Sequence, residues 1–209
     1  MRGLKRFFTA VVASVVALSA NAQDPSFTQF YSNPIYLNPA LAGTHGCARF
    51  AANYRNQWPS WSGNYVTYAL GYDQYFKQIS GGIGVLATHD MTGKATIQTS
   101  MIGLIYSYHL NVTRKFSLLF GARAAWYQKF LDWDKLTFGD MIDPRKGFIY
   151  QTGDVPRGGT KGFFDASAGI VGYSDIFYFG VAVHHLNMPN ESMIVGNSPL
   201  PVRYTAHAG

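Results

Sequence analysis

The feature that most constrains this chain is a two-residue alternation of apolar and polar or small side chains. It is longest in residues 65–76, 95–110 and 115–130. Successive side chains of a β-strand point to opposite faces of a sheet, so this period predicts strands with one apolar face. Transmembrane strands need about 9–11 residues, whereas ordinary strands average about 5–6. The length of these runs therefore favours strands that cross a membrane.

The two faces of the predicted strands differ in composition. The apolar faces carry Val66, Tyr68, Leu70 and Tyr72 in the first run, Ile102, Leu104, Tyr106, Tyr108 and Leu110 in the second, and Phe116, Leu118, Phe120, Ala122, Ala124 and Trp126 in the third. The opposite faces carry Thr67, Ala69, Gly71 and Asp73, then Thr99, Gly103, Ser107 and His109, then Ser117, Gly121, Arg123 and Lys129. Small residues on the polar face are typical of a barrel lumen, and aromatic residues near strand ends are typical of interfacial girdles.

The composition agrees with a membrane sheet. Charged residues make up 13% of the chain, against about 25% in typical soluble domains. Aromatic residues reach 16%. A single cysteine, Cys47, excludes a disulfide scaffold. The excess of basic residues is small once the N-terminus is set aside, and no Lys/Arg-rich run exists, so nucleic acid is not expected as a partner.

Residues 1–22 have the three parts of a secretory signal peptide. Arg2, Lys5 and Arg6 form a positive region, an apolar stretch runs over 7–18, and Ala20-Asn21-Ala22 forms a small-x-small cleavage site. Cleavage there makes Gln23 the first mature residue. The alternative is a retained N-terminal anchor, although the stretch is short of the roughly 20 apolar residues of a membrane-spanning helix.

The mature chain is predicted to have two parts. Residues 23–46 are expected to be irregular, because Pro25, Pro34 and Pro39 prevent strand pairing. Residues 47–209 are predicted to form an outer-membrane β-barrel of about eight strands, with an outer loop over 131–161. The remaining predicted strands cover 48–57, 82–89, 162–173, 176–186 and a short one from Val202. The predicted fold is thus an all-β, antiparallel transmembrane β-barrel, incomplete at its C-terminus, and the alternative is a soluble β-sandwich.

Several motifs resemble one known family. Residues 23–30 read Gln-Asp-Pro-Ser-Phe-Thr-Gln-Phe, and Asn33-Pro34 and the segment 37–43, Leu-Asn-Pro-Ala-Leu-Ala-Gly, follow. Further matches are Tyr-Arg-Asn-Gln-Trp at 54–58, the segment 131–140, Phe-Asp-Ala-Ser-Ala-Gly at 164–169 and His-His-Leu-Asn at 184–187. In this order they resemble the PorP/SprF family of the Bacteroidetes type IX secretion machinery.

The resemblance implies a FadL-like barrel in the outer membrane that serves protein secretion and gliding motility. The implied role is to assist the export or surface anchoring of adhesins through protein–protein contacts. The implied partners are outer-membrane lipid, periplasmic ring and lipoprotein components of the secretion system, and secreted adhesin cargo. Neither an enzymatic activity nor a cofactor is expected. Two alternatives are a channel or transporter for a small solute and, less favoured, a lipid enzyme at the barrel rim.

Two groups of residues are candidates for a functional role. The family-like motifs point to plug or partner contacts at Asn33, Pro34, Asn38, Pro39, Ala40, Gly43, Tyr54, Arg55, Gln57 and Trp58. Proline fixes the backbone and asparagine caps turns, so the first six could form a plug or a periplasmic docking element; the alternative is a structural lead-in to the first strand. Arg49, Arg55 and Arg123 are predicted to face the lumen, where they would either be solvated or bind a plug carboxylate.

No catalytic or metal site is predicted. His184 and His185 are adjacent and would point to opposite faces of a strand. The remaining histidines lack a zinc-site spacing. The acidic residues of 132–143 lack a calcium-loop pattern, and the Gly-rich stretch 82–87 is interpreted as a strand because a turn, not a helix, follows it.

Overall fold

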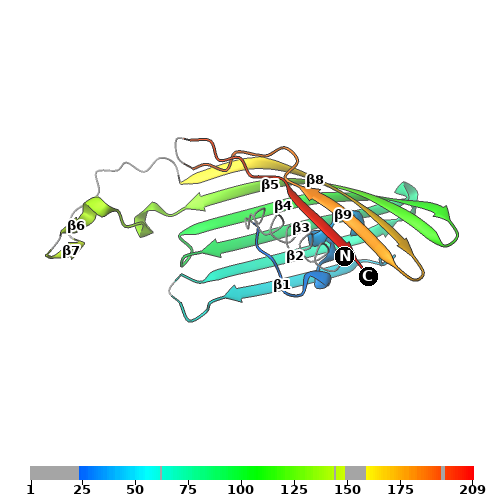
Figure 1. Cartoon of the computed structure of the whole chain (residues 1–209), viewed down its shortest axis with the longest axis horizontal. Coiled ribbons are helices and arrows are strands. Elements are labelled where there is room, and N and C mark those ends of the chain that lie inside the picture. Colours follow the sequence, from blue (N-terminus) through cyan, green and yellow to red (C-terminus); the bar gives the residue numbers. More distant parts are fainter. Residues whose placement is uncertain (1–23, 62, 144, 149–158, 194–195) are drawn as a thin grey trace, which may run out of the picture.

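The computed structural model describes residues 24–61, 63–143, 145–148, 159–193 and 196–209, so the predicted signal peptide lies outside the described residues. One antiparallel sheet dominates the fold (Figure 1). Its strands are β1 (Arg49–Gln57), β2 (Tyr65–Phe76), β3 (Gly81–Thr92), β4 (Ile97–Thr113), β5 (Phe116–Leu131), β8 (Thr160–Ser174), β9 (Tyr178–His184) and β10 (Arg203–Ala208).

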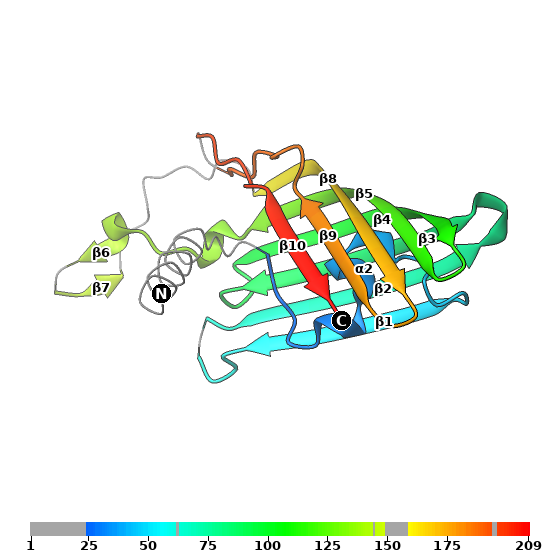
Figure 2. The same ribbon diagram turned by 45° about the vertical axis from the view of Figure 1, so that its right-hand side comes forward.

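The sheet is a meander in which each strand pairs with the next one in the order β1-β2-β3-β4-β5-β8-β9-β10. It curls strongly, and β10 comes round over the concave side without pairing with β1 (Figure 2). The described residues therefore form an incomplete antiparallel β-barrel, which confirms the predicted fold class. No helix among the described residues is long and apolar enough to span a membrane.

The two faces of the sheet match the predicted alternation. On the convex face, large apolar side chains stay exposed, such as Phe50 at 82% and Leu104 at 64%. On the concave face of β2 and β4, Thr67, Ile105 and Ser107 are buried. Soluble monomers rarely expose an apolar patch larger than a few hundred Å². The convex face is therefore suited to hydrocarbon.

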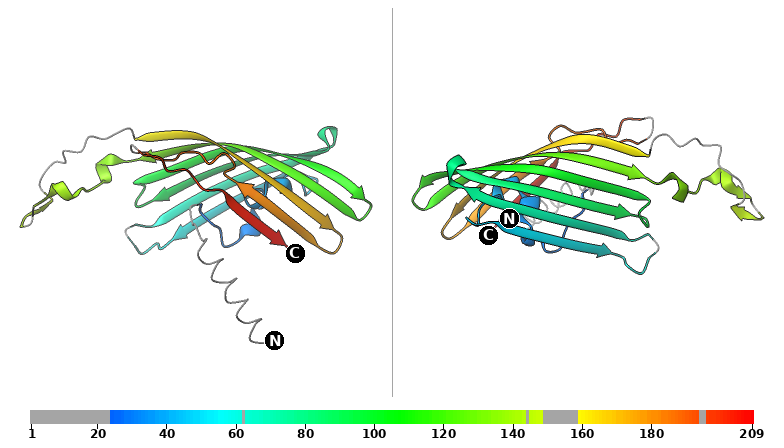
Figure 3. Two further views of the ribbon diagram at one scale, coloured as in Figure 1. Left: turned by 45° about the horizontal axis from the view of Figure 1, so that its top comes forward. Right: turned by 180° about the vertical axis from the view of Figure 1, so that it is seen from behind.

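The segment between β5 and β8 departs from a plain loop. It contains the single turns η4 (Trp133–Lys135) and η5 (Gly139–Met141) and the short hairpin of β6 (Ile142–Asp143) and β7 (Gly147–Phe148). Figure 3 shows that this segment reaches beyond the end of the sheet. Sequence reasoning placed a loop here and missed the hairpin, because two-residue strands carry no periodicity.

The connections differ in length at the two ends of the sheet. The turns over 77–80, 114–115 and 175–177 lie at one end, here called the short-turn end. The connections over 58–64, 93–96, 132–159 and 185–202 lie at the other, here called the long-connection end. Outer-membrane barrels have short periplasmic turns and longer extracellular loops. That rule predicts that the long-connection end faces the cell exterior.

The segment before β1 contains three short helical turns. They are η1 (Phe30–Ser32), α2 (Pro34–Leu37) and η2 (Pro39–Leu41). Each of the last two begins with a proline, whose fixed φ suits the first helical position. No strand occurs in the described residues 24–46, and the sequence analysis did not predict these turns. Two apolar clusters form the core between this segment and the sheet, one around Ile35 and Ile105 and the other around Ala40 and Leu119.

Candidate functional site

The concave face of the sheet is covered by the N-terminal segment, and this contact is the candidate site. The described part of the segment begins at Asp24, whose carboxylate reaches His185 and Arg203 at the long-connection end. It reaches the short-turn end at Ala42, whose carbonyl oxygen lies 3.0 Å from His109 Nε2. The segment thus runs lengthwise along the interior before β1 begins.

Two strands come unusually close to this segment because each has a glycine at the contact. A Cβ atom at Gly82 of β3 would lie 2.7 Å from the Cα atom of Gly43, and one at Gly121 of β5 would overlap the backbone of Pro39 and Ala40. Real Cβ atoms essentially never come that close to backbone atoms. Only glycine permits the observed approach at these two positions.

Asn38 ties the segment to three further strands. Its Nδ2 donates to the carbonyl oxygens of Ile170 in β8 at 3.3 Å and Val181 in β9 at 3.2 Å, and lies 3.1 Å from Nε2 of His207 in β10. Its Oδ1 accepts from Ala40 N at 2.9 Å and so caps the turn η2. The side chain is fully buried. Both ends of the amide are therefore satisfied by the docked conformation.

A buried carboxylate fixes the end of the segment beside β1. Asp73 of β2 accepts from Arg49 Nε at 2.8 Å and from Arg49 Nη2 at 3.0 Å, in the two-pronged geometry that arginine favours. The same carboxylate accepts from the backbone N–H of Gly43 at 2.7 Å. One carboxylate therefore connects β1, β2 and the N-terminal segment.

A second charged network lies toward the long-connection end. His185 stands between two carboxylates, with Nδ1 2.9 Å from Asp165 Oδ1 and Nε2 2.9 Å from Asp24 Oδ2. Asp165 also accepts from Arg123 at 3.3 Å, and Asp24 accepts from Arg203 at 2.7 Å. Asp165 is fully buried, and Arg123 is 4% exposed. The network links β5, β8 and β10 to Asp24, the first described residue of the N-terminal segment.

The network determines the protonation states of Asp24 and His185, its two members that lie outside the strands. Burial alone would lower the pKa of the His185 imidazole, but hydrogen bonds to Asp165 and Asp24 outweigh it and raise the pKa to about 9. Burial would raise the pKa of the Asp24 carboxyl, but the bond from His185 and the charge of Arg203 outweigh it and lower the pKa to about 2. At neutral pH this contact is therefore an ion pair.

The N-terminal segment is held unevenly along its length. Residues 33–43, here called the plug core, contain the buried Asn33, Ile35, Asn38 and Ala40. Residues 24–32, here called the strap, are mostly exposed. The strap is held by the Asp24 ion pairs, by the Tyr36 hydroxyl donating to Pro25 O, and by an edge-on ring contact of Phe27 with Tyr36 at 5.3 Å. Ion pairs therefore contribute to holding the strap, whereas buried side chains and the hydrogen bonds of Asn38 and Gly43 hold the plug core.

We expect the strap to loosen in alkaline solution. A raised histidine pKa contributes stability that is complete below the ordinary value of 6.5 and is lost as the pH rises through about 9. A nitroxide at Ser26→Cys, in a Cys47→Ser background, should become more mobile over this range, while the same label in His185→Gln should not respond. A flat profile in the parent protein would contradict the assignment. The titratable and charged groups around the imidazole are Asp24, Asp165, Arg123, Arg203, His184, Tyr36 and Tyr127.

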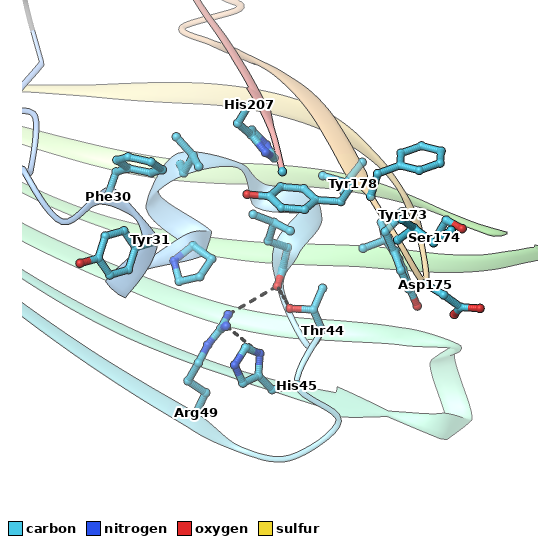
Figure 4. A pocket seen from close by; sticks show the side chains of 18 residues that line it. Phe30, Tyr31, Thr44, His45, Arg49, Tyr173, Ser174, Asp175, Tyr178 and His207 are labelled. Atoms are coloured by element: carbon cyan, nitrogen blue, oxygen red, sulfur yellow. Dashed lines mark hydrogen bonds between the residues drawn. The ribbon is translucent and has the colours of Figure 1, made fainter. Parts of the chain in front are cut away.

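A cleft of about 580 Å³ lies beside the plug core at the short-turn end. Figure 4 shows Phe30 and Tyr31 on one side of it and Tyr173 and Tyr178 on the other. Arg49 borders the cleft but is held by His45 at 3.0 Å and by Asp73. The lining is mostly apolar, and the Arg49–Asp73 ion pair lies at its border.

The structure separates the sequence-predicted site residues into three sets. Asn33, Pro34, Asn38, Pro39, Ala40 and Gly43 lie on the concave face and contact the strands or each other. Arg49 and Arg123 also lie there, each paired with a strand carboxylate. Arg55 bonds Gln57 at 2.6 Å on the same face, apart from the plug core, whereas Tyr54 and Trp58 are exposed.

Sequence reasoning missed the acidic and histidine members of the site. Asp73 and Asp165 stand within strands at positions facing the concave side, and a carboxylate there signals a buried partner. His184 and His185 were expected to point to opposite faces because both were placed within one strand, but β9 ends at His184. His185 has φ 59°, which ends the strand, and both side chains are buried.

Comparison with known proteins gives one match. A family model described as the type IX secretion system membrane protein PorP/SprF matches residues 19–209. Searches among curated proteins and solved structures found no match. The matched range includes the N-terminal segment and all eight strands of the main sheet.

Proposed function

Because the chain belongs to the PorP/SprF family of type IX secretion system membrane proteins, we propose that it assists the export or surface anchoring of adhesins through contacts with protein partners. The family and the curled antiparallel sheet fit an outer-membrane component. The proposed partners are outer-membrane lipid on the convex face, periplasmic ring and lipoprotein components at the short-turn end, and the adhesin cargo.

The observation that carries this proposal is the covered interior. We propose that residues 23–46 act as a plug, that residues 1–22 are a cleaved signal peptide, and that 47–209 belong to the barrel wall. Arg49 and Arg123 are paired with buried carboxylates, and backbone of the plug core touches β3 and β5. A conduit for solutes would need a wet, open path along this face. The protein is therefore better suited to holding partners than to conducting small molecules.

The test is deletion of the gene followed by measurement of adhesin on the cell surface. We expect surface adhesin to fall strongly and to return when the wild-type gene is supplied, and we expect a periplasmic secretion component to co-purify with the protein. Liposomes containing the protein should swell in an isotonic sugar no faster than protein-free liposomes. Normal surface adhesin with no co-purifying partner would contradict the proposal, and rapid swelling would favour the channel alternative.

A further inference from the structure

The side chains around Asp24 form a binding site for one negatively charged group. Asp24 accepts from His185 at 2.9 Å and from Arg203 at 2.7 Å, and both contacts use the same oxygen, Oδ2. Without Asp24, the cluster would hold three cationic groups, Arg123, Arg203 and His185, against one carboxylate, Asp165. Arg123 and His185 are buried, whereas the Arg203 side chain is 32% exposed. Buried charge without a partner is strongly unfavourable, so the cluster favours an anion at this position.

This binding site contains side-chain nitrogen atoms that form no hydrogen bond with Asp24. Among the described residues, no hydrogen-bond partner is found for Nε of Arg203, for Nε of Arg123 or for either ring nitrogen of His184. His184 is fully buried and is the cross-strand partner of Arg203, so the two side chains share the concave face. A carboxylate that engaged both Nε and Nη of Arg203 would use the fork geometry that this side chain favours.

The resident carboxylate sits on the part of the plug that packs least. The strap residues after Asp24 are mostly exposed, and the plug core from Asn33 onward stays docked through its own contacts. The Asp24 end can therefore leave without undocking the rest of the segment. A site occupied by a loosely tethered ligand of the same chain is open to exchange.

We propose that His185 and Arg203 form an exchangeable carboxylate-binding site on the lumen wall, occupied here by Asp24 of the chain's own strap. The ligand class is a carboxylate, which the site binds by charge-assisted hydrogen bonds. Its position at the long-connection end places it near the mouth of the barrel. The inference rests on the geometry of the wall and does not depend on the proposed role in secretion.

Chemical rescue tests this site in the full-length purified protein. Asp24→Gly removes the atoms that acetate supplies. Sodium acetate should raise the thermal unfolding midpoint of this variant in a saturable way, by about 3 °C at high occupancy, whereas sodium chloride at equal ionic strength should not. Asp24→Asn, which fills the space without charge, and Asp24→Gly with Arg203→Gln should not respond. No acetate effect, or an equal effect in the control variants, would overturn the proposal.

A second readout covers failure of the glycine variant to fold. A nitroxide at Ser26→Cys, in the Cys47→Ser background, should gain several-fold in mobile fraction when Asp24→Asn is added. The exposed carboxylate of Asp175 provides the matched control, and Asp175→Asn should leave the label unchanged. A strap that stays as immobile in Asp24→Asn as in the parent protein would also overturn the proposal, because Asp24 would then not be the tethered ligand.

Discussion

A valine at position 121 is expected to expel the plug core from the concave face. The Cβ of any side chain at Gly121 would overlap the backbone of Pro39 and Ala40, and neither backbone can move without breaking the Asn38 contacts. Overpacking by even a few carbon atoms typically costs about 1–3 kcal/mol, and backbone overlap lies at the upper end. The segment should therefore undock while the strands remain paired.

Limited proteolysis of outer membranes checks this expectation. Residues 24–46 should resist cleavage in the wild-type protein and become the first site of cleavage in Gly121→Val. The matched control is Ala122→Val. Ala122 follows Gly121 in β5, and its side chain lies on the exposed convex face. The plug assignment would be wrong if both variants protected the N-terminal segment equally.

Loss of the Asp165 carboxylate should be the most destabilising single charge change. Asp165→Ala would leave Arg123 and His185 buried beside each other without their shared partner. Removing one member of a buried ion pair costs about 3–5 kcal/mol, which corresponds to a fall of roughly 10 °C in the unfolding midpoint for a domain of this size. Heat-modifiable gel migration measures that midpoint directly.

The control for this change is Asp175→Ala, which removes an exposed carboxylate from the turn between β8 and β9. Surface substitutions of this kind are usually within about 0.5 kcal/mol of neutral. If the two variants unfolded at the same temperature, the buried network would contribute nothing, and the anchor between the wall and the N-terminal segment would have to lie elsewhere.

The strands were predictable because an exposed apolar face and a packed inner face impose a strict period of two. The run 65–76 coincides with β2, and the small residues predicted for its inner face, Ala69 and Gly71, are buried there. Strand ends were less well defined. The predicted run 82–89 continues to Thr92 in β3, because the hydrogen-bonded ladder with β4 extends past the point where the apolar alternation fades.

The contacts within the site could not be predicted because they join residues that are distant in sequence. Asp24 and His185 are 161 positions apart, and Asn38 and His207 are 169 apart. Arg123 was expected either to be solvated or to bind a plug carboxylate, and periodicity alone does not predict that it pairs with Asp165 of β8. The helical turns of the N-terminal segment were hidden because proline both ends strands and begins helical turns.

Oxygen accessibility of nitroxide labels along β4 tests the central claim, that the convex face lies in hydrocarbon and the concave face is covered by protein. In proteoliposomes, labels at Ile102 and Leu104 should collide with dissolved oxygen at the high rate found in lipid. A label at Ile105, which is buried, should be shielded from oxygen and from a polar relaxant alike. Equal shielding at Leu104 and Ile105, as in a soluble sandwich with both faces packed, would contradict the account.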